Sequence, residues 1–202
     1  MKLYYSPAAC SLAVHIVLRE IGQPFDLARV DTKTHKLADG GDFYAVNAKG
    51  YVPVLELDDG TRITEGPVIT RYLSDKARRE DLIPAAGTME RYRVEEWQNY
   101  ITSELHKTFT PLFGSAYDAA SRQLFIASLR KKYGWVSEQL AGREYLTGKT
   151  FTVADAYLFT VTNWAKFVSL DISDLAPVQA YLGRVAQRPA VRAALEAEGL
   201  TK

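Results

Sequence analysis

A tight turn between two short extended runs is the feature that most limits how this chain can fold. Asp59-Gly60 is a strong hairpin motif, and the runs at 51–57 and 61–63 flank it. A helix is expected next, from Pro67 to Leu73, because proline suits the first helical position, where its missing N–H is no loss. The sequence therefore predicts a strand–strand–helix unit in this part of the chain.

A different unit is predicted near the N-terminus. The apolar run at 2–5 indicates a strand, and the helical spacing of apolar residues over 11–20 indicates a helix that ends at Gly22. Alternating apolar residues over 25–30 indicate a second strand. The polar, Gly-containing stretch at 31–42 is expected to be a loop over a short irregular helix. A crossover unit followed by the hairpin unit predicts a small α/β domain.

The rest of the chain is helical in pattern. A stretch at 77–87 is charged, then contains Pro and Gly, and lacks any period, so it is predicted to be a linker between domains at 1–76 and 88–202. The expected helices run from 88 to about 113, with Pro111 kinking or ending the first; from 121 to 140; from 152 onward; and from 178 to 195, broken at Arg188-Pro189.

The third of these helices has a recognisable start. Thr152 and Asp155 stand three residues apart, so each side chain can accept a hydrogen bond from the other residue's backbone N–H. This is a capping box with Asp in place of the usual Glu. Asp155 is therefore predicted to be structural rather than catalytic.

Composition argues against several function classes. The 202 residues carry a formal net charge of +1, which gives no bulk attraction to nucleic acid or to an anionic membrane. No apolar run approaches the roughly 20 residues that span a bilayer, and the N-terminus lacks a signal-peptide pattern, so a cytoplasmic location is expected.

No metal site is predicted, because the spacing typical of metal ligands is missing among His15, His35, His106 and Cys10. His15 is expected to be a partly buried or surface residue with no neighbouring carboxylate.

Cys10 is the chain's single cysteine, and it falls at the start of the first predicted helix. Free backbone N–H groups and the positive end of the helix dipole favour a thiolate there. The alternative is that a small cysteine packs beneath the helix, as many single cysteines do. One cysteine cannot form an internal disulfide, so the fold does not depend on an oxidising compartment.

The order of these elements resembles the cytosolic glutathione transferase architecture, which is an α/β thioredoxin-like N-terminal domain followed by an all-α domain. Cys10 at the first helix start, together with residues 103–107, resembles the bacterial beta class in particular. Three further segments match family motifs: Tyr51-Val52-Pro53 resembles the X-Pro segment with a cis bond, Thr64-Glu65-Gly66-Pro67 the Glu/Gln-Ser segment, and Phe151–Asp155 the capping-box segment. The resemblance covers essentially the whole chain.

The resemblance implies a homodimeric enzyme that conjugates glutathione, its co-substrate, to small hydrophobic electrophiles in detoxification, without a metal. Two other activities of the same site stay open, namely glutathione-dependent dehalogenation and disulfide reduction. Because residue 13 is alanine, disulfide chemistry would proceed through a mixed disulfide of Cys10 with glutathione. A non-catalytic module that binds glutathione is the alternative of another class.

The expected catalytic residues are Cys10 and His106, with Tyr5 and Ser11 as alternative hydroxyls for steadying the thiolate. By this resemblance, His35 stands where the family has a lysine for the glycyl carboxylate, with Lys36 beside it and Lys33 nearby. The predicted glutathione contacts are Cys10, His35, Lys36, Val52, Glu65, Gly66, Asn99, Ser103, Glu104 and His106, some of them from the partner subunit.

Within this set, Gly66 would offer N–H groups to the γ-glutamyl carboxylate, and Glu65 would take the ammonium group. The alternative for Glu65 is an ordinary acidic residue at a helix start. Val52 would pair its backbone with the cysteinyl part of glutathione.

His106 is also expected to share a helix face with three other polar residues. Asn99, Ser103, His106 and Lys107 stand at positions i, i+4, i+7 and i+8, so they would line a cleft or form a solvated face. The electrophile site is predicted at Lys107, Phe109, Phe113 and Trp164. Core packing is the alternative for the aromatic residues, and for Phe113 it is the favoured one.

Overall fold

The computed structural model describes residues 1–201, and these form two compact units. The first unit contains Met1–Glu80 together with the segment from Arg188 onward, and the second contains Asp81–Gln187. The C-terminal segment thus packs with the N-terminal residues, whereas the sequence placed it in the helical domain. The domain boundaries at 1–76, 77–87 and 88–202 stay a prediction, since compactness alone does not define a domain.

The first unit is built on a five-stranded sheet of order β3-β2-β1-β4-β5. β1 runs parallel to β2, as a crossover requires, while the other neighbours are antiparallel. The predicted crossover unit and hairpin are therefore confirmed. The strands are β1 (Lys2–Tyr5), β2 (Asp26–Asp31), β3 (Lys36–Leu37), β4 (Val54–Glu56) and β5 (Arg62–Thr64).

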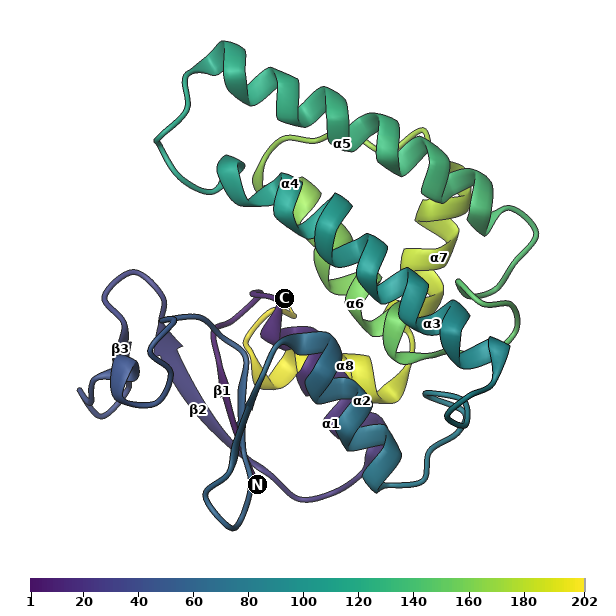
Figure 1. Ribbon diagram of the computed structural model, residues 1–202. Helices are drawn as coiled ribbons and strands as arrows, with labels where there is room; N and C mark the ends of the chain where they lie inside the picture. Colours follow the sequence, from purple (N-terminus) through teal and green to yellow (C-terminus); the bar gives the residue numbers. More distant parts are fainter. Residues whose placement is uncertain (202) are drawn as a thin grey trace. The chain divides into compact units, whose positions relative to one another are not determined.

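Three helices of this unit lie together beside the sheet (Figure 1). They are α1 (Ser11–Ile21), α2 (Gly66–Lys76) and α8 (Pro189–Ala197), and α1 contacts both of the others. The first eight residues of α1 are all buried, because neighbouring helices and the sheet enclose them. Cys10 directly precedes this buried helix, so its place in the fold is fixed by core packing.

The stretch at 31–42 differs from the prediction of a loop with a short irregular helix. The Asp31 carboxylate accepts hydrogen bonds from the N–H groups of Lys33 and Thr34, which turns the chain back on itself. The two residues of β3 then pair antiparallel with the end of β2. A short 3₁₀ turn follows at Phe43–Ala45.

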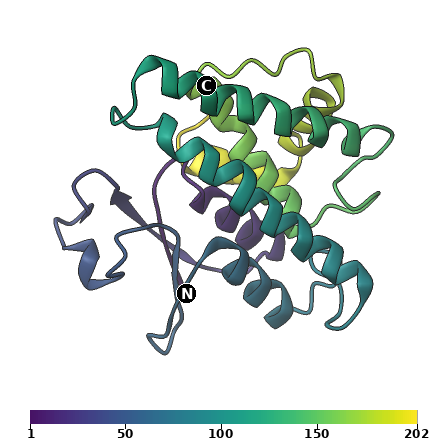
Figure 2. The same cartoon turned by 45° about the horizontal axis from the view of Figure 1, so that its top comes forward.

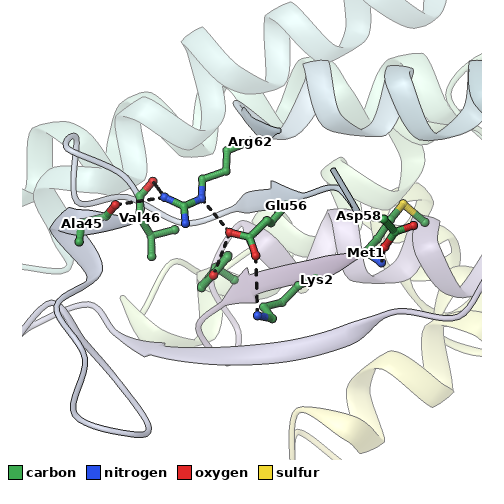
Figure 3. A network of polar contacts seen from close by, with 8 residues as sticks. Met1, Lys2, Ala45, Val46, Glu56, Asp58 and Arg62 are labelled. Atoms are coloured by element: carbon green, nitrogen blue, oxygen red, sulfur yellow. Dashed lines mark hydrogen bonds and ion pairs between the residues drawn. The ribbon is translucent and has the colours of Figure 1, made fainter. Parts of the chain in front are cut away.

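Glu56 of β4 contacts side chains from β1 at the centre of the sheet and from β5 at its edge (Figure 3). Its carboxylate accepts from Arg62 Nε at 2.7 Å and from Tyr4 Oη at 3.2 Å, and it lies 3.7 Å from Lys2 Nζ. Arg62 also donates to the carbonyls of Ala45 and Val46. This arrangement anchors the segment after β3 to the hairpin.

The second unit is helical, as predicted, and α6 (Val153–Thr162) is its most enclosed element (Figure 2). All ten residues of α6 are buried, and the helix contacts α3, α7 and the turn that follows α3. The capping box of Thr152 and Asp155 at its start is confirmed. The other elements are α3 (Met89–Tyr100), α4 (Lys107–Phe109), α5 (Ala119–Leu140) and α7 (Ala176–Ala186), with 3₁₀ turns at Thr110–Leu112 and Asn163–Phe167.

The predicted long helix from 88 to about 113 is not one regular helix. Between α3 and α4 the segment Ile101–His106 is π-helical, and we call it the π turn. Pro111 lies in the 3₁₀ turn that ends the helical stretch, as expected. None of the helices within residues 1–201 combines the length and the apolar character that crossing a membrane requires.

Candidate functional site

Cys10 and Val52 lie together in the first unit. Cys10 precedes the first turn of α1 and is half-buried, and its Sγ donates a hydrogen bond to the Val52 carbonyl at 3.3 Å. The Val52–Pro53 peptide bond is cis, which the resemblance implied. A thiol at a helix start thus stands beside the extended backbone segment that leads into β4.

Ser11 and Tyr5 occupy a different environment from Cys10. Ser11 is fully buried, and its hydroxyl donates to the Ser6 carbonyl and accepts from the Ser6 N–H, both at 3.2 Å. Tyr5 is also buried, with its ring edge-on to that of His15. Cys10 is more exposed than Ser11 and Tyr5, so its thiol is the most accessible of the three candidate groups.

The loop before Cys10 is held by a residue that the sequence did not single out. Glu198, just after α8, accepts from the Ala8 N–H at 3.0 Å and lies 2.9 Å from His15 Nδ1. The side chains of His15 and Glu198 are both fully buried. The expectation that His15 has no carboxylate neighbour is therefore wrong, because the partner lies 183 residues further along the chain.

Glu65 and Gly66 stand at the start of α2 in the same unit. Glu65 is exposed and has a positive φ of 68°, and the helix begins at Gly66. The Glu65 carboxylate lies 2.5 Å from Lys49 Nζ, which also donates to Thr64 Oγ1 at 2.9 Å. Lys49 was not predicted as a site residue, since its position in the turn before residue 51 gave no indication that it reaches the helix start.

His35 is in contact with neighbouring residues, whereas Lys36 is exposed. His35 Nδ1 lies 3.2 Å from the Gly50 carbonyl, and its ring packs against that of Tyr44, tilted by 33°, with ring centres 4.6 Å apart. A Cβ at Gly50 would come within 2.8 Å of the Tyr44 ring, so this packing requires glycine. Lys36 is exposed on β3.

In the second unit, the π turn changes the predicted polar face. A π turn bonds i to i+5 and so adds one residue to a turn, which rotates every later side chain by about 100°. The assumption of α-helical spacing from Asn99 to Lys107 is therefore wrong. Asn99 and Ser103 are exposed, and each donates to the carbonyl four residues earlier. Lys107 is exposed as well.

Glu104 lies inside the π turn and receives a side chain from α5. Its carbonyl oxygen accepts from Thr108 Oγ1 at 2.6 Å and from Lys132 Nζ at 2.8 Å. The Glu104 carboxylate lies 3.1 Å from the same Nζ. Sequence reasoning missed Lys132, whose helix is separated from the π turn by a loop.

His106 ends the π turn and is surrounded by aromatic rings of its own unit. Its Nδ1 lies 2.6 Å from Tyr157 Oη, and its ring is edge-on to Trp164 at 4.8 Å. Phe109 and Phe113 also contact Trp164, at 5.7 and 5.4 Å between ring centres. The structure thus brings together the histidine and all three predicted aromatic residues.

These aromatic residues differ in exposure. Phe109 and Trp164 are buried, whereas Phe113 is 53% exposed. Core packing, the favoured alternative for Phe113, is therefore wrong. An exposed phenylalanine against a buried tryptophan forms an apolar surface beside His106.

Within residues 1–201, no three His, Cys, Asp or Glu side chains are grouped so that they could hold a metal ion.

Comparison with known proteins gives matches along the chain. The family model for the glutathione S-transferase N-terminal domain matches residues 8–76, and that for the C-terminal domain matches residues 102–197. The glutathione S-transferase GstA of Escherichia coli O157:H7 is 48% identical over 200 residues, which are 99% of this chain and 100% of that protein.

Solved structures agree with this result. A bacterial beta-class glutathione S-transferase from Sphingomonas chungbukensis has a TM-score of 0.96 and 43% identity, with 100% of each chain covered. A sphingomonad glutathione S-transferase in complex with glutathione has a TM-score of 0.94 and 42% identity, again with 100% of each chain covered.

Proposed function

The chain belongs to the glutathione S-transferase family and to its bacterial beta class, and from this premise we propose that it conjugates glutathione to small hydrophobic electrophiles. The observation that carries the proposal is the half-buried Cys10 thiol 3.3 Å from the Val52 carbonyl, at the start of α1. A relative of the same fold binds glutathione. Glutathione is accordingly the proposed co-substrate.

Three groups of the first unit suit three parts of glutathione. The backbone of Val52 pairs with the cysteinyl part, the N–H groups at the start of α2 around Gly66 receive the γ-glutamyl carboxylate, and Glu65 receives the ammonium group. Lys49 already forms an ion pair with Glu65. Glutathione's ammonium group therefore either displaces Lys49 from the Glu65 carboxylate or binds that carboxylate beside it.

The glycyl carboxylate is assigned to Lys36 rather than to His35. The His35 ring is already in contact with Gly50 and Tyr44, whereas Lys36 is exposed and carries an ammonium group. Asn99, Ser103 and Glu104 complete the proposed contacts, some from the partner subunit of a homodimer. A cytoplasmic location is part of the same proposal.

In the proposed reaction, Cys10 and His106 act on the glutathione sulfur. Cys10 holds the glutathione sulfur by hydrogen bonding. His106 steadies the glutathione thiolate, or takes part in proton transfer, while that thiolate attacks the electrophile. Lys107, Phe109, Phe113 and Trp164 line the electrophile site. Its exposed Phe113 beside buried Trp164 suits a small apolar ring.

The accessible thiol also supports a disulfide reaction. The Cys10 thiolate attacks one sulfur of oxidised glutathione, the S–S bond breaks, and one glutathione thiolate leaves, which gives a mixed disulfide. A second glutathione thiolate attacks this bond, restores the Cys10 thiolate and regenerates oxidised glutathione. With a mixed disulfide of glutathione and another thiol as the first oxidant, attack on its glutathione sulfur releases the other thiolate, and the second step then gives oxidised glutathione at the expense of one glutathione molecule.

Turnover of an aryl chloride activated by nitro groups tests the main proposal, with wild type compared against Cys10→Ala, Ser11→Ala and Tyr5→Phe. We expect conjugation by wild type and the largest loss of rate in Cys10→Ala. Full rate in Cys10→Ala would remove the cysteine from the mechanism. Glutathione binding without turnover across several electrophiles, dehalogenation included, would indicate a non-catalytic module instead.

Mass spectrometry after treatment with oxidised glutathione tests the disulfide reaction. We expect one glutathione adduct on wild type and none on Cys10→Ala. Unmodified wild type would exclude the reaction. Sedimentation equilibrium at micromolar concentration tests the homodimer, which a monomer would contradict.

A further inference from the structure

Lys49 is an exposed lysine that reaches from the turn before Val52 to the start of α2. Its Nζ lies 2.5 Å from Glu65 Oε1 and donates to Thr64 Oγ1 at 2.9 Å. The side chains of Lys49 and Glu65 are 48% and 66% exposed, so a molecule in solution can reach both. All of these residues belong to the first unit, so the ion pair is a feature of that unit alone.

The backbone that carries Lys49 is fixed by a buried asparagine. The Asn47 side chain accepts from the Lys49 N–H at 3.2 Å and donates to the Tyr51 carbonyl at 2.7 Å. The Gly50 N–H donates to the Asn47 carbonyl at 2.8 Å. These bonds close a turn, so the lysine side chain leaves the backbone at a defined point, three residues before Val52.

The start of α2 offers few hydrogen-bond donors to an anion. Gly66 has no side chain, and Pro67 after it has no N–H. The Ile69 N–H already donates to the Glu65 carbonyl. In the first turn this leaves the N–H groups of Gly66 and Val68 for an anion, and neither carries a charge. Because a carboxylate accepts about four hydrogen bonds, these two donors leave room for a charged one.

The ion pair itself has capacity for a further partner on each side. An ammonium group has three N–H bonds, and within residues 1–201 Lys49 Nζ meets two oxygen atoms, those of Thr64 and Glu65. In the same part of the chain, Lys49 reaches the Glu65 carboxylate through Oε1. One N–H of Lys49 and the Oε2 atom of Glu65 can therefore receive a ligand together.

The γ-glutamyl end of glutathione carries an ammonium group and a carboxylate on the same carbon. Lys49 and Glu65 present the opposite two charges, 2.5 Å apart. When the two pairs lie side by side in opposite directions, each of the four groups has two neighbours of opposite charge. Hydrogen bonds between charged groups are also stronger than those between neutral groups. The ion pair therefore matches an α-amino acid end as a unit.

Displacement of Lys49 by the ligand would be less favourable. It would exchange one ammonium group for another at Glu65 and break the bond from Lys49 to Thr64. It would also leave the γ-glutamyl carboxylate with the two uncharged donors of α2.

We propose that Lys49 is a specificity-determining residue that stays paired with Glu65 and donates to the γ-glutamyl carboxylate, so that the site selects thiols with a free α-amino acid end. This role rests on the proposed function, because it takes glutathione as the ligand. Of the two arrangements left open for the ammonium group, it selects binding to Glu65 beside Lys49.

Isothermal titration calorimetry of full-length wild type and Lys49→Gln tests the role with three ligands. The first is S-methylglutathione, whose blocked sulfur prevents reaction with Cys10. The second is its analogue without the α-carboxylate, and the third is its analogue without the α-ammonium group. We expect Lys49→Gln to raise the Kd of the first and third ligands about three- to tenfold, and to leave that of the second unchanged or lower.

Two further variants separate this role from a general effect of charge. Lys49→Arg keeps a cation with several N–H donors, so it should restore most of the affinity for S-methylglutathione. Lys76→Gln removes an exposed lysine from the last turn of α2, at the opposite end from Gly66, and should bind all three ligands like wild type.

The outcomes separate the role of Lys49 from the proposed function. A Kd that changes equally for all three ligands in Lys49→Gln, or for none, would overturn the role. Tighter binding of S-methylglutathione by Lys49→Gln would show that Lys49 competes with the ligand, and would overturn it as well. If wild type does not bind S-methylglutathione, the proposed function fails and this role fails with it. The expected pattern of Kd values without turnover of any electrophile would overturn the proposed conjugation alone.

Discussion

Lys132 Nζ lies 2.8 Å from the Glu104 carbonyl oxygen, so a lysine of α5 supports the π turn that carries His106. In an α-helix this carbonyl would accept from the N–H four residues later. In the π turn the ladder shifts by one residue, as the bond from the Lys107 N–H to the Thr102 carbonyl shows. At this point of the chain, Lys132 and the Thr108 hydroxyl donate side-chain hydrogen bonds to the Glu104 carbonyl.

Lys132→Met is therefore expected to lower the free energy of unfolding by about 1–3 kcal/mol, because it keeps the side-chain length but removes the donor. Urea unfolding at neutral pH measures the change. Lys131→Met is the matched control, since Lys131 is the exposed neighbour on the same helix. Equal stability of the two variants would show that Lys132 does not support the π turn.

Glu198→Leu is expected to destabilise the first unit by about 2–4 kcal/mol. The substitution removes the carboxylate that accepts from the Ala8 N–H and lies against the buried His15 ring. Since Ala8 stands two residues before Cys10, we also expect faster modification of the thiol by an alkylating reagent. Glu196→Leu, at an exposed position of α8, is the control and should behave like wild type.

How much the sequence could predict depended on how far apart the partners lie. The Asp59-Gly60 turn, the capping box at 152–155 and the break at Pro189 are decided by neighbouring residues, and all were correctly predicted. Periodicity alone could not reveal the π turn, because one of the side chains that bonds it, Lys132, lies 28 residues from Glu104.

The candidate site shows the same limit. Cys10 was found from its helix start and His106 from the resemblance, but the partners of both regions are distant in sequence. Glu198 stands 190 residues from Ala8, and Tyr157 stands 51 residues from His106. No local pattern marks such contacts, since packing of whole helices creates them.

Asp155→Asn should destabilise the protein, and the loss should grow as the pH falls from 7 to 5. Burial raises the pKa of Asp155 to about 6, although hydrogen bonds from Leu146, Thr152 and Tyr181 oppose the shift. A folded-state pKa above the unfolded value means that the native state binds the proton first, so this carboxyl favours folding more at pH 5 than at pH 7. Asparagine lacks this contribution.

Unfolding in urea at pH 7 and pH 5 measures the difference between wild type and Asp155→Asn. At pH 7 we expect a loss of about 1–3 kcal/mol from the disrupted capping box. A difference that shrinks on acidification would contradict a raised pKa.

Glu56 should show the opposite dependence on pH. The hydrogen bond from Arg62 holds the pKa of Glu56 below its ordinary value, although burial opposes the shift, and Tyr4 and Lys2 add to the lowering. The stabilisation is therefore present above the unfolded pKa of about 4.3 and is lost as the pH falls through the lower folded-state value.

The difference in unfolding free energy between wild type and Glu56→Gln is accordingly expected to be larger at pH 6 than at pH 3. Glu138→Gln, at an exposed position of α5, is the control for a change of net charge. A difference that is independent of pH would indicate that Arg62 does not perturb Glu56.

Lys36→Gln should raise the KM for glutathione by about three- to tenfold, because it removes one exposed cation from a carboxylate contact that solvent screens. His35→Asn should instead reduce stability, since the His35 ring stacks on Tyr44 and bonds the Gly50 carbonyl. Steady-state kinetics with glutathione varied at a fixed electrophile concentration separates these effects, and Lys33→Gln controls for loss of a nearby exposed charge.

If Lys33→Gln raises the KM and Lys36→Gln does not, the glycyl carboxylate is bound from the turn before β3. If only His35→Asn raises the KM while its stability is unchanged, the imidazole is the donor and its contact with Gly50 gives way when glutathione binds.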